Sequence, residues 1–323
     1  MGSGFSNFLV APPEDVIRFT VGQPDFVTSE AIRQTAIDEL QAGNTFYTRS
    51  AGDLSLCSAL AEWLDEKFSI KTDSEQIVIT PGCKQALFYG FLGLGNPGDE
   101  VLLLAPAWPS YASMVKHLSM VPVDVPVNMN GFHPDMGALE EAVTEKSKFL
   151  VINSPNNPTG AVYTKEEVEA LVAFACEHDL WILDDMIYAT MTWGDSTYTS
   201  PSTVPGGQDR TMTIGGWSKA WAMTGWRLGY ITGPEIAMKA IRLCQSNTAS
   251  HAPTFLMPAA RTALSDEERR LEMERSFAER RSVILKELET IPQIKFWEPE
   301  GAFYVMIDIS GTGMDSIEFA ERT

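Results

Sequence analysis

Short apolar segments alternate with longer amphipathic segments through the middle of the chain. Near-continuous apolar runs, which are typical of strands buried on both faces, occur at 77–80, 101–105, 148–153, 180–185, 211–216 and 227–233. Segments with apolar residues at helical spacing lie between them, at 83–94, 109–119 and 166–179. Strands separated by crossover helices predict a mostly parallel sheet that helices cover on both faces.

The two ends of the chain have a different pattern. Residues 28–42 and 53–69 predict helices, and the segment 265–291 predicts a long charged helix that precedes a strand at 303–309. The pattern therefore indicates an α/β fold with a large and a small domain. We expect three parts: an N-terminal segment that packs with the small domain, a large domain, and an interdomain helix leading into a smaller α+β domain, at 1–40, 41–235 and 236–323.

Composition limits the functions that the chain can have. The sequence has 24 Lys and Arg against 43 Asp and Glu, which gives a net charge of −19 and argues against nucleic acid or an anionic membrane as a partner. No apolar run is long enough to span a bilayer, and the first residues do not resemble a secretory signal. We therefore expect a cytoplasmic protein.

The cysteines and histidines do not form a recognisable metal or disulfide pattern. The four cysteines are widely separated and include no C-x-x-C pair, and the four histidines are equally scattered. This spacing favours unpaired cysteines in a reducing compartment and predicts no metal site.

The segment 215–230, GGWSKAWAMTGWRLGY, carries the most informative pattern in the sequence. Its S-K-x-x-x-M-x-G-W-R-x-G arrangement resembles the lysine signature of class I/II aminotransferases, which bind pyridoxal 5'-phosphate (PLP). Further blocks resemble the family in the same order: VGQPDF (21–26), FYT (46–48), TPGCKQALF (80–88), PAWPSY (106–111), NSPNNPTG (153–160), DMIY (185–188) and PEGAFY (299–304). The resemblance covers nearly the whole chain and implies PLP-transferase fold type I of the aspartate aminotransferase-like kind.

By this resemblance, Lys219 forms the Schiff base with the cofactor aldehyde and later moves protons. A lysine in a dry site near other cations has a lowered pKa, which suits both tasks. Arg227 is expected to bind the cofactor phosphate, because its planar guanidinium matches two phosphate oxygens. Ser218 is expected to add a hydroxyl donor.

A second block places Gly82, Cys83 and Lys84 at a strand-to-helix junction. The free N–H groups and the positive end of a helix make such a junction an anion site, and Gly82 allows close approach. The family binds the cofactor phosphate at this place. We expect Cys83 to be a small loop residue and not a nucleophile, while Lys84 is either a cofactor contact or surface charge.

Asp185 is expected at the carboxyl end of a buried strand, where ligands of open α/β sheets bind. By resemblance, its carboxylate keeps the pyridine nitrogen protonated, so that the ring can accept electrons. Its neighbour Asp184 lies one place off the D-x-x-Y spacing and is expected to be structural. Tyr188 and Asn157 are expected to form hydrogen bonds with the ring oxygen of the cofactor.

Three further positions follow from the resemblance alone. Trp108 is expected to stack on the cofactor ring and exclude water. Tyr47 corresponds to a tyrosine that reaches the phosphate of the neighbouring subunit, which implies a homodimer with shared active sites. Gly22 is expected near the substrate carboxylate, where the absence of a side chain leaves room. The expected substrate contacts are therefore Gly22, Trp108 and Asn157.

The implied reaction is transfer of an amino group between an L-amino acid and a 2-oxo acid, through a Lys219 aldimine and with ping-pong kinetics. Two alternatives stay open: a PLP-dependent C–S lyase or synthase on the same fold, and a non-catalytic PLP-binding domain. The general look of the sequence suggests the branch that holds aspartate, aromatic and alanine aminotransferases. Family members continue to a late arginine that binds the substrate carboxylate, whereas this sequence ends at Thr323. We therefore expect it to be a fragment.

Overall fold

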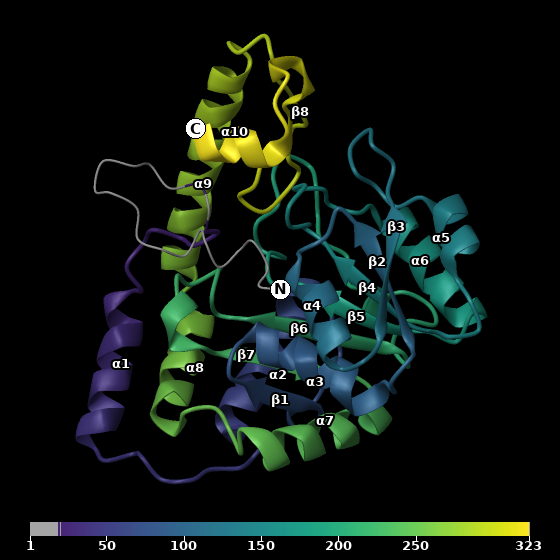
Figure 1. Ribbon diagram of the computed structural model, residues 1–323. Helices are drawn as coiled ribbons and strands as arrows, with labels where there is room; N and C mark the ends of the chain where they lie inside the picture. The colour runs from purple at the N-terminus through teal and green to yellow at the C-terminus, as the bar shows by residue number, and fades with distance from the viewer. Residues whose placement is uncertain (1–18, 20, 323) are drawn as a thin grey trace.

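The computed structural model describes residue 19 and residues 21–322. Residues 1–18 and 20 of the predicted N-terminal segment 1–40 lie outside the described residues. The described residues form a seven-stranded sheet in the order β1-β7-β6-β5-β4-β2-β3 (Figure 1). The strands are β1 (Ile77–Thr80), β2 (Glu100–Ala105), β3 (Val121–Pro126), β4 (Ser147–Asn153), β5 (Trp181–Asp185), β6 (Thr211–Gly216) and β7 (Gly229–Thr232).

The sheet is mostly parallel, as the sequence predicts. Strands β3, β2, β4, β5 and β6 pair in parallel, and β7 is antiparallel to both of its neighbours, β6 and β1. Strands β1 and β6 therefore point the same way, and the carboxyl ends of β1, β4, β5 and β6 lie at one edge. Asn153 pairs with Asp185 where β4 and β5 end, so these two residues are neighbours at that edge.

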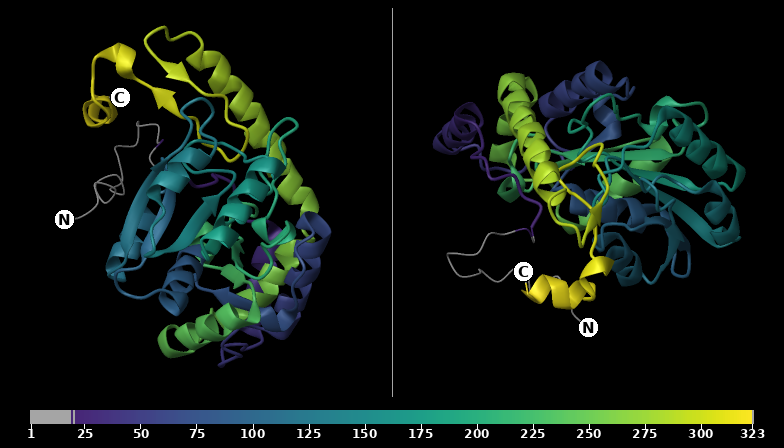
Figure 2. Two further views of the ribbon diagram at one scale, coloured as in Figure 1. Left: turned by 90° about the vertical axis from the view of Figure 1, so that its right-hand side faces the viewer. Right: turned by 90° about the horizontal axis from the view of Figure 1, so that it is seen from above.

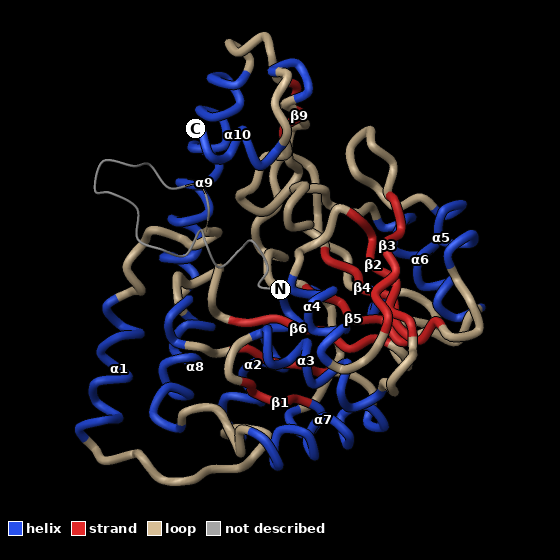
Figure 3. Tube along the Cα trace, in the orientation of Figure 1, coloured by secondary structure: helices blue, strands red, loops and turns tan. Residues whose placement is uncertain are grey.

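Helices cover both faces of the sheet (Figure 3). One face packs against α3 (Cys83–Leu94), α4 (Ser110–His117) and α7 (Glu235–Thr248). The other face packs against α2 (Leu54–Phe68), α5 (Met136–Ala142), α6 (Lys165–Glu177) and α8 (Met257–Ser265). Helix α1 (Glu30–Gln41) lies beside α8. Short 3-10 turns occur at Ser74–Gln76, Pro201–Thr203, Thr224–Trp226, Thr254–Leu256 and Ser310–Thr312.

A smaller C-terminal part stands at one end of the molecule (Figures 1 and 2). Helix α9 (Glu267–Leu288) leads to it, and it contains the antiparallel pair β8 (Lys295–Phe296) and β9 (Ile307–Asp308) and the helix α10 (Ser316–Arg322). Among the described residues, no helix combines the length and apolar character needed to cross a membrane.

The strand predicted over 303–309 is wrong in extent, because only Ile307–Asp308 is extended and paired. The preceding residues bond instead to loops of the sheet-bearing part: Ala302 N–H donates to Met191 O (2.8 Å) and Glu300 N–H donates to Gly160 O (2.9 Å). Ala302 also has a φ of +56°, a left-handed conformation that interrupts an extended strand. This bend turns Phe303 and Tyr304 toward the carboxyl edge of the sheet.

Candidate active site

The residues that the sequence singles out converge at the carboxyl edge of the sheet. Asp185 ends β5, and Lys219 lies three residues after the end of β6. Asn157 follows β4, while Gly82 connects β1 to the start of α3. In parallel α/β sheets this edge is where ligands bind, since the loops that leave the strands surround an open crevice.

Lys219 is the amine at the centre of this cluster. Its Nζ donates a short hydrogen bond to the carbonyl oxygen of Gly22. The same atom lies 5.7 Å from the ring centre of Phe303 and 6.0 Å from that of Tyr188. Burial lowers the pKa of Lys219 to about 8, and the charge of Arg227 acts in the same direction, whereas Cys83 and Asp185 oppose the shift. A useful fraction of the amine is therefore unprotonated near neutral pH.

Asp185 is a buried carboxylate held on both oxygens. Tyr111 Oη donates a hydrogen bond of 2.6 Å to Oδ2, and the Ile187 N–H donates one of 3.3 Å to Oδ1. Burial raises the pKa of Asp185 to about 6, while Tyr111, the Ile187 N–H and Lys219 limit the rise. The sequence analysis missed Tyr111. It is the last residue of the PAWPSY block, so its place in that block was the available signal.

The side chains of Tyr188 and Asn157 both form a hydrogen bond with the hydroxyl of Tyr304. Tyr304 Oη is 2.6 Å from Tyr188 Oη and accepts a hydrogen bond of 3.4 Å from Asn157 Nδ2. The backbone N–H of Asn157 donates to Asn153 Oδ1 (2.9 Å), and Asn153 Nδ2 donates to Asp185 O (2.9 Å). Asn153 and Tyr304 were also missed, although both belong to blocks that the sequence analysis quoted.

The backbone at the junction of β1 and α3 packs against the guanidinium of Arg227. We call Gly82, the first turn of α3 and Arg227 the phosphate cradle. Gly82 has a φ of +84°, and a Cβ added there would lie 2.4 Å from Arg227 Nη2. A Cβ at Gly229 would lie 2.4 Å from the Cys83 nitrogen, so the start of β7 and the start of α3 are in close contact. Gly82 offers α3 no side-chain cap, which leaves the first N–H groups of the helix to bind an anion.

The remaining predicted residues around this junction have distinct positions. Cys83 Sγ donates to Gly215 O at 2.9 Å, and burial raises the pKa of this thiol, so it is a poor nucleophile. Ser218 is buried next to Lys219 in the chain. Lys84 Nζ lies 4.9 Å from the ring centre of Trp108, and burial, with a smaller contribution from Arg227, lowers its pKa.

Gly22 and Tyr47 differ in how they relate to the cluster. Gly22 is part of it, because a Cβ at this position would lie 2.1 Å from Tyr304 Oη. Tyr47 is 91% exposed, and its described ring contact is with His251 (5.6 Å). Within a single chain, Tyr47 therefore does not join the residues around Lys219.

Asp184 points to the opposite face of the sheet from Asp185, since side chains alternate along a strand. Its Oδ2 accepts hydrogen bonds from Tyr198 Oη (2.6 Å), Ser200 Oγ (2.9 Å) and Thr213 Oγ1 (3.4 Å). Burial raises its pKa to about 7. These contacts connect β5 to the loop after it and to β6, away from Lys219.

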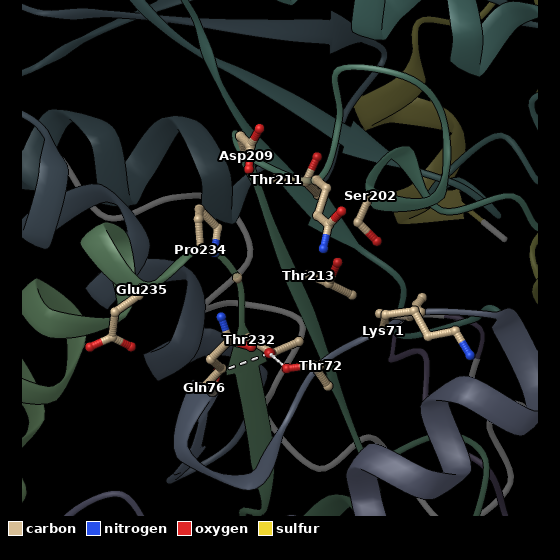
Figure 4. Close-up of a pocket in the computed structure, with 13 residues that line it drawn as sticks. Lys71, Thr72, Gln76, Ser202, Asp209, Thr211, Thr213, Thr232, Pro234 and Glu235 are labelled. Atoms are coloured by element: carbon tan, nitrogen blue, oxygen red, sulfur yellow. Dashed lines mark hydrogen bonds between the residues drawn. The ribbon is translucent and has the colours of Figure 1, made fainter.

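A separate cavity of about 170 Å³ lies at the other edge of the sheet (Figure 4). Thr211 at the start of β6 and Thr232 at the end of β7 contribute to its wall. Thr232 Oγ1 donates to Gln76 O (2.9 Å) and lies 2.6 Å from Thr72 Oγ1. Because β6 runs from this cavity toward Lys219, the cavity and the candidate active site lie at opposite ends of the same strand.

The donor groups at the carboxyl edge fit PLP one by one. An amine of lowered pKa suits the aldehyde, and a helix N-terminus with a guanidinium suits the phosphate. A buried carboxylate suits the pyridine nitrogen, and the Tyr188 hydroxyl and the Asn157 amide suit the ring oxygen. The side-chain-free surface at Gly82 leaves room for the phosphate beside Arg227.

Comparisons with known proteins identify the family to which the chain belongs. The sequence matches the family "Aminotransferase class I and II" over residues 14–322. It is 39% identical over 312 residues to an aspartate/prephenate aminotransferase of Thermus thermophilus, covering 95% of this chain and 80% of that protein. It is also 39% identical to a bifunctional aspartate aminotransferase and glutamate/aspartate-prephenate aminotransferase of Petunia hybrida, over 94% of this chain. The chain spans only 64% of the Petunia protein's length.

Solved structures match over almost all of the chain. The T. thermophilus aspartate aminotransferase with maleate has a TM-score of 0.89 at 39% identity, covering 94% of this chain and 80% of that one. An aromatic aminotransferase of Pyrococcus horikoshii has a TM-score of 0.92 at 36% identity, covering 98% and 86%. The chain therefore belongs to the aminotransferase class I and II family, whose members use PLP, and the relatives named here are transaminases.

Proposed function

We propose that this chain transfers an amino group between an L-amino acid and a 2-oxo acid, with Lys219 as the residue that binds PLP. The observation that carries this proposal is the position of Lys219, a partly buried amine of lowered pKa in one cluster with Asp185 and Arg227. These three groups suit the aldehyde, the pyridine nitrogen and the phosphate of the cofactor, respectively.

Each part of the cofactor has a residue to hold it. The first turn of α3, Arg227 and Ser218 would bind the phosphate, and Tyr188 and Asn157 would donate hydrogen bonds to the ring oxygen. When bound, the cofactor supplies an electron-withdrawing pyridine ring that stabilises negative charge at the substrate α-carbon. Asp185 would hold a proton at the ring nitrogen, because its buried negative charge favours a cation beside it.

Proton movement at the substrate would depend on Lys219. Its unprotonated Nζ can accept a proton from the substrate α-carbon and return it at another atom. The Gly22 carbonyl accepts a hydrogen bond from this Nζ and so limits the directions in which the amine can point. Trp108 would cover one face of the ring and keep water from the reacting atoms.

The proposed substrates are amino acids with an acidic side chain and their 2-oxo acids. Three of the four proteins named above are aspartate or aspartate/prephenate aminotransferases, and the fourth is an aromatic aminotransferase. Lys84 offers a cation for a side-chain carboxylate, since it lies over Trp108 and forms no ion pair with another described residue. A carboxylate bound there would be close to the cofactor phosphate cradle and would gain from the charge of Arg227 as well.

The proposed assembly is a homodimer with shared active sites, in the cytoplasm. Phe46 and Tyr47 are 79% and 91% exposed, which is unusual for two adjacent aromatic residues in a monomer. A second copy that covers this surface would bring Tyr47 toward the phosphate cradle of its partner. Sedimentation of the wild-type protein and of Tyr47→Phe would show whether each forms a dimer, and titration of both with PLP would show whether the variant binds the cofactor more weakly while it is still dimeric.

The test of the cofactor assignment is an absorption spectrum after incubation with PLP. We expect a visible band that borohydride fixes covalently to a Lys219 peptide, and we expect Lys219→Ala to lack it. Initial rates with aspartate and 2-oxoglutarate should then give the parallel double-reciprocal lines of a ping-pong mechanism. A wild-type protein with no band would overturn the proposal, and intersecting lines would contradict the kinetic mechanism.

A further inference from the structure

The segment 299–304 lies after the interdomain helix in sequence, yet it is fastened to loops of the sheet-bearing part. Gly301 N–H donates to Gly160 O (2.8 Å), and Trp193 N–H donates to Glu300 O (2.7 Å). Trp193 Nε1 donates to Ala302 O (2.9 Å), and the Glu300 carboxylate accepts a hydrogen bond from the Val162 N–H (2.9 Å). Three consecutive residues of the segment, Glu300, Gly301 and Ala302, are thus held by hydrogen bonds to loops of the sheet-bearing part.

This anchoring places the Tyr304 phenol against the residues expected to hold the ring oxygen. Its Oη is 2.6 Å from Tyr188 Oη and accepts from Asn157 Nδ2 at 3.4 Å. The ring packs edge-on against Tyr188 at 5.6 Å between centroids. The Tyr304 hydroxyl also occupies the space that a side chain at Gly22 would fill. Burial raises the pKa of Tyr304 to about 12, so the phenol keeps its proton at neutral pH.

The direction of these hydrogen bonds follows from the number of protons available. A phenol has one proton to donate and can accept from other donors. If Tyr188 donates its proton to the ring oxygen, as the proposed function requires, its own oxygen must accept from Tyr304. The Asn157 amide has two N–H groups, so it can serve Tyr304 with one and the ring oxygen with the other.

We propose that Tyr304 is a positioning residue of the cofactor site, whose hydroxyl donates to Tyr188 and makes Tyr188 a stronger and better oriented donor to the ring oxygen. The inference rests on the proposed function. A hydroxyl that accepts one hydrogen bond donates more strongly to the next partner in a chain. Because such donors favour a negatively charged ring oxygen, Tyr304 also lowers the pH at which the Lys219-bound cofactor loses its proton.

The experiment compares four proteins carrying PLP: wild type, Tyr304→Phe, Tyr188→Phe and the double variant. The pH midpoint of the visible band is measured for each. We expect Tyr188→Phe to raise the midpoint by about 1 pH unit and Tyr304→Phe to raise it by roughly 0.3 pH unit. In the Tyr188→Phe background, Tyr304→Phe should add no further shift, because its effect passes through Tyr188.

Tyr89→Phe is the matched control. It also deletes a hydroxyl that bonds to another hydroxyl, Thr248 Oγ1 at 2.5 Å, but it does so on α3 away from Tyr188. We expect it to leave the midpoint unchanged. Thermal unfolding of Tyr304→Phe should give a Tm within about 3 °C of wild type, which shows that a shifted midpoint does not come from loss of the fold.

The outcomes distinguish this inference from the proposed function. A wild-type protein without a borohydride-fixable band would overturn both. A normal wild-type band with an unchanged midpoint in Tyr304→Phe would overturn only the role of Tyr304. Additive shifts in the double variant would also overturn it, since they would mean that Tyr304 does not act through Tyr188.

Discussion

Tyr111 Oη donates a 2.6 Å hydrogen bond to Oδ2 of Asp185, and both side chains are almost completely buried. Tyr111 lies on α4, which packs over β2 and β3, whereas Asp185 ends β5. The contact therefore joins a covering helix to the functional edge of the sheet. It fixes the direction of the carboxylate and stabilises its ionised form, which burial alone would disfavour.

Replacement of Tyr111 by Phe should raise the pKa of Asp185 further, because the hydrogen bond that opposes the effect of burial is lost. Loss of such a bond to a charged group corresponds to about one pH unit. We expect the acidic limb of the pH profile of kcat/KM to move up by about that amount, so that kcat/KM falls about twofold at pH 7 and about tenfold below pH 6. Tyr89→Phe should show neither effect. An unchanged acidic limb in Tyr111→Phe would mean that Asp185 does not control it.

Replacement of Gly82 by Ala should weaken PLP binding at least about tenfold, because the added methyl group would collide with Arg227 in the phosphate cradle. Gly98→Ala is the matched control. Gly98 also has a positive φ, +91°, but a Cβ there would meet nothing within 4 Å.

Both alanine variants should lose about 1 kcal/mol of unfolding free energy from backbone strain. Only Gly82→Ala should lose cofactor affinity, as measured by titration of the tryptophan fluorescence with PLP. Equal affinities in the two variants would argue against a phosphate site at this junction.

Replacement of Lys219 by Met should stabilise the cofactor-free protein at neutral pH. Burial lowers the pKa of Lys219 from 10.5 to about 8, so the folded protein binds its proton more weakly than the unfolded chain does. Above pH 10.5 the lysine is uncharged in both states and does not lower the free energy of unfolding. Below about pH 8 it is charged in both states, and its burial lowers the free energy of unfolding by the full amount.

We expect Lys219→Met to gain roughly 2 kcal/mol in unfolding free energy at pH 7, after allowance for its partial exposure, and little near pH 10.5. Thermal or urea unfolding at these two pH values measures the difference. A variant that is less stable than wild type at pH 7 would show that the contact with the Gly22 carbonyl outweighs the cost of burying the charge.

Replacement of Lys84 by Met should affect acidic substrates selectively. If Lys84 binds the side-chain carboxylate, the KM for aspartate should rise about tenfold or more, since a charge-assisted contact is lost. The KM for alanine, which has no side-chain carboxylate, should stay within about twofold of wild type. Equal increases for both amino acids would instead assign Lys84 to the cofactor phosphate.

The amino-acid sequence alone determined the layered architecture and the identity of most of the candidate site. Buried parallel strands require apolar side chains on both faces, so β1, β4 and β6 stand out as apolar runs. The N-cap residues Ser29 and Asp53 mark the starts of α1 and α2 within two residues of the predicted positions. The special chemistry of Lys219, Asp185 and Gly82 is local to short motifs, and each motif lies where a strand ends.

Only the tertiary structure decided which residues support those groups. The predicted strand at 303–309 is mostly a loop, because long-range bonds from Glu300 and Ala302 outweigh the strand preference of the residues that follow. The partners Tyr111 and Tyr304 are 74 and 116 residues away from Asp185 and Tyr188 in the chain. Contacts at such separations depend on how α4 and segment 299–304 pack against the sheet, which no local pattern of apolar and polar residues specifies.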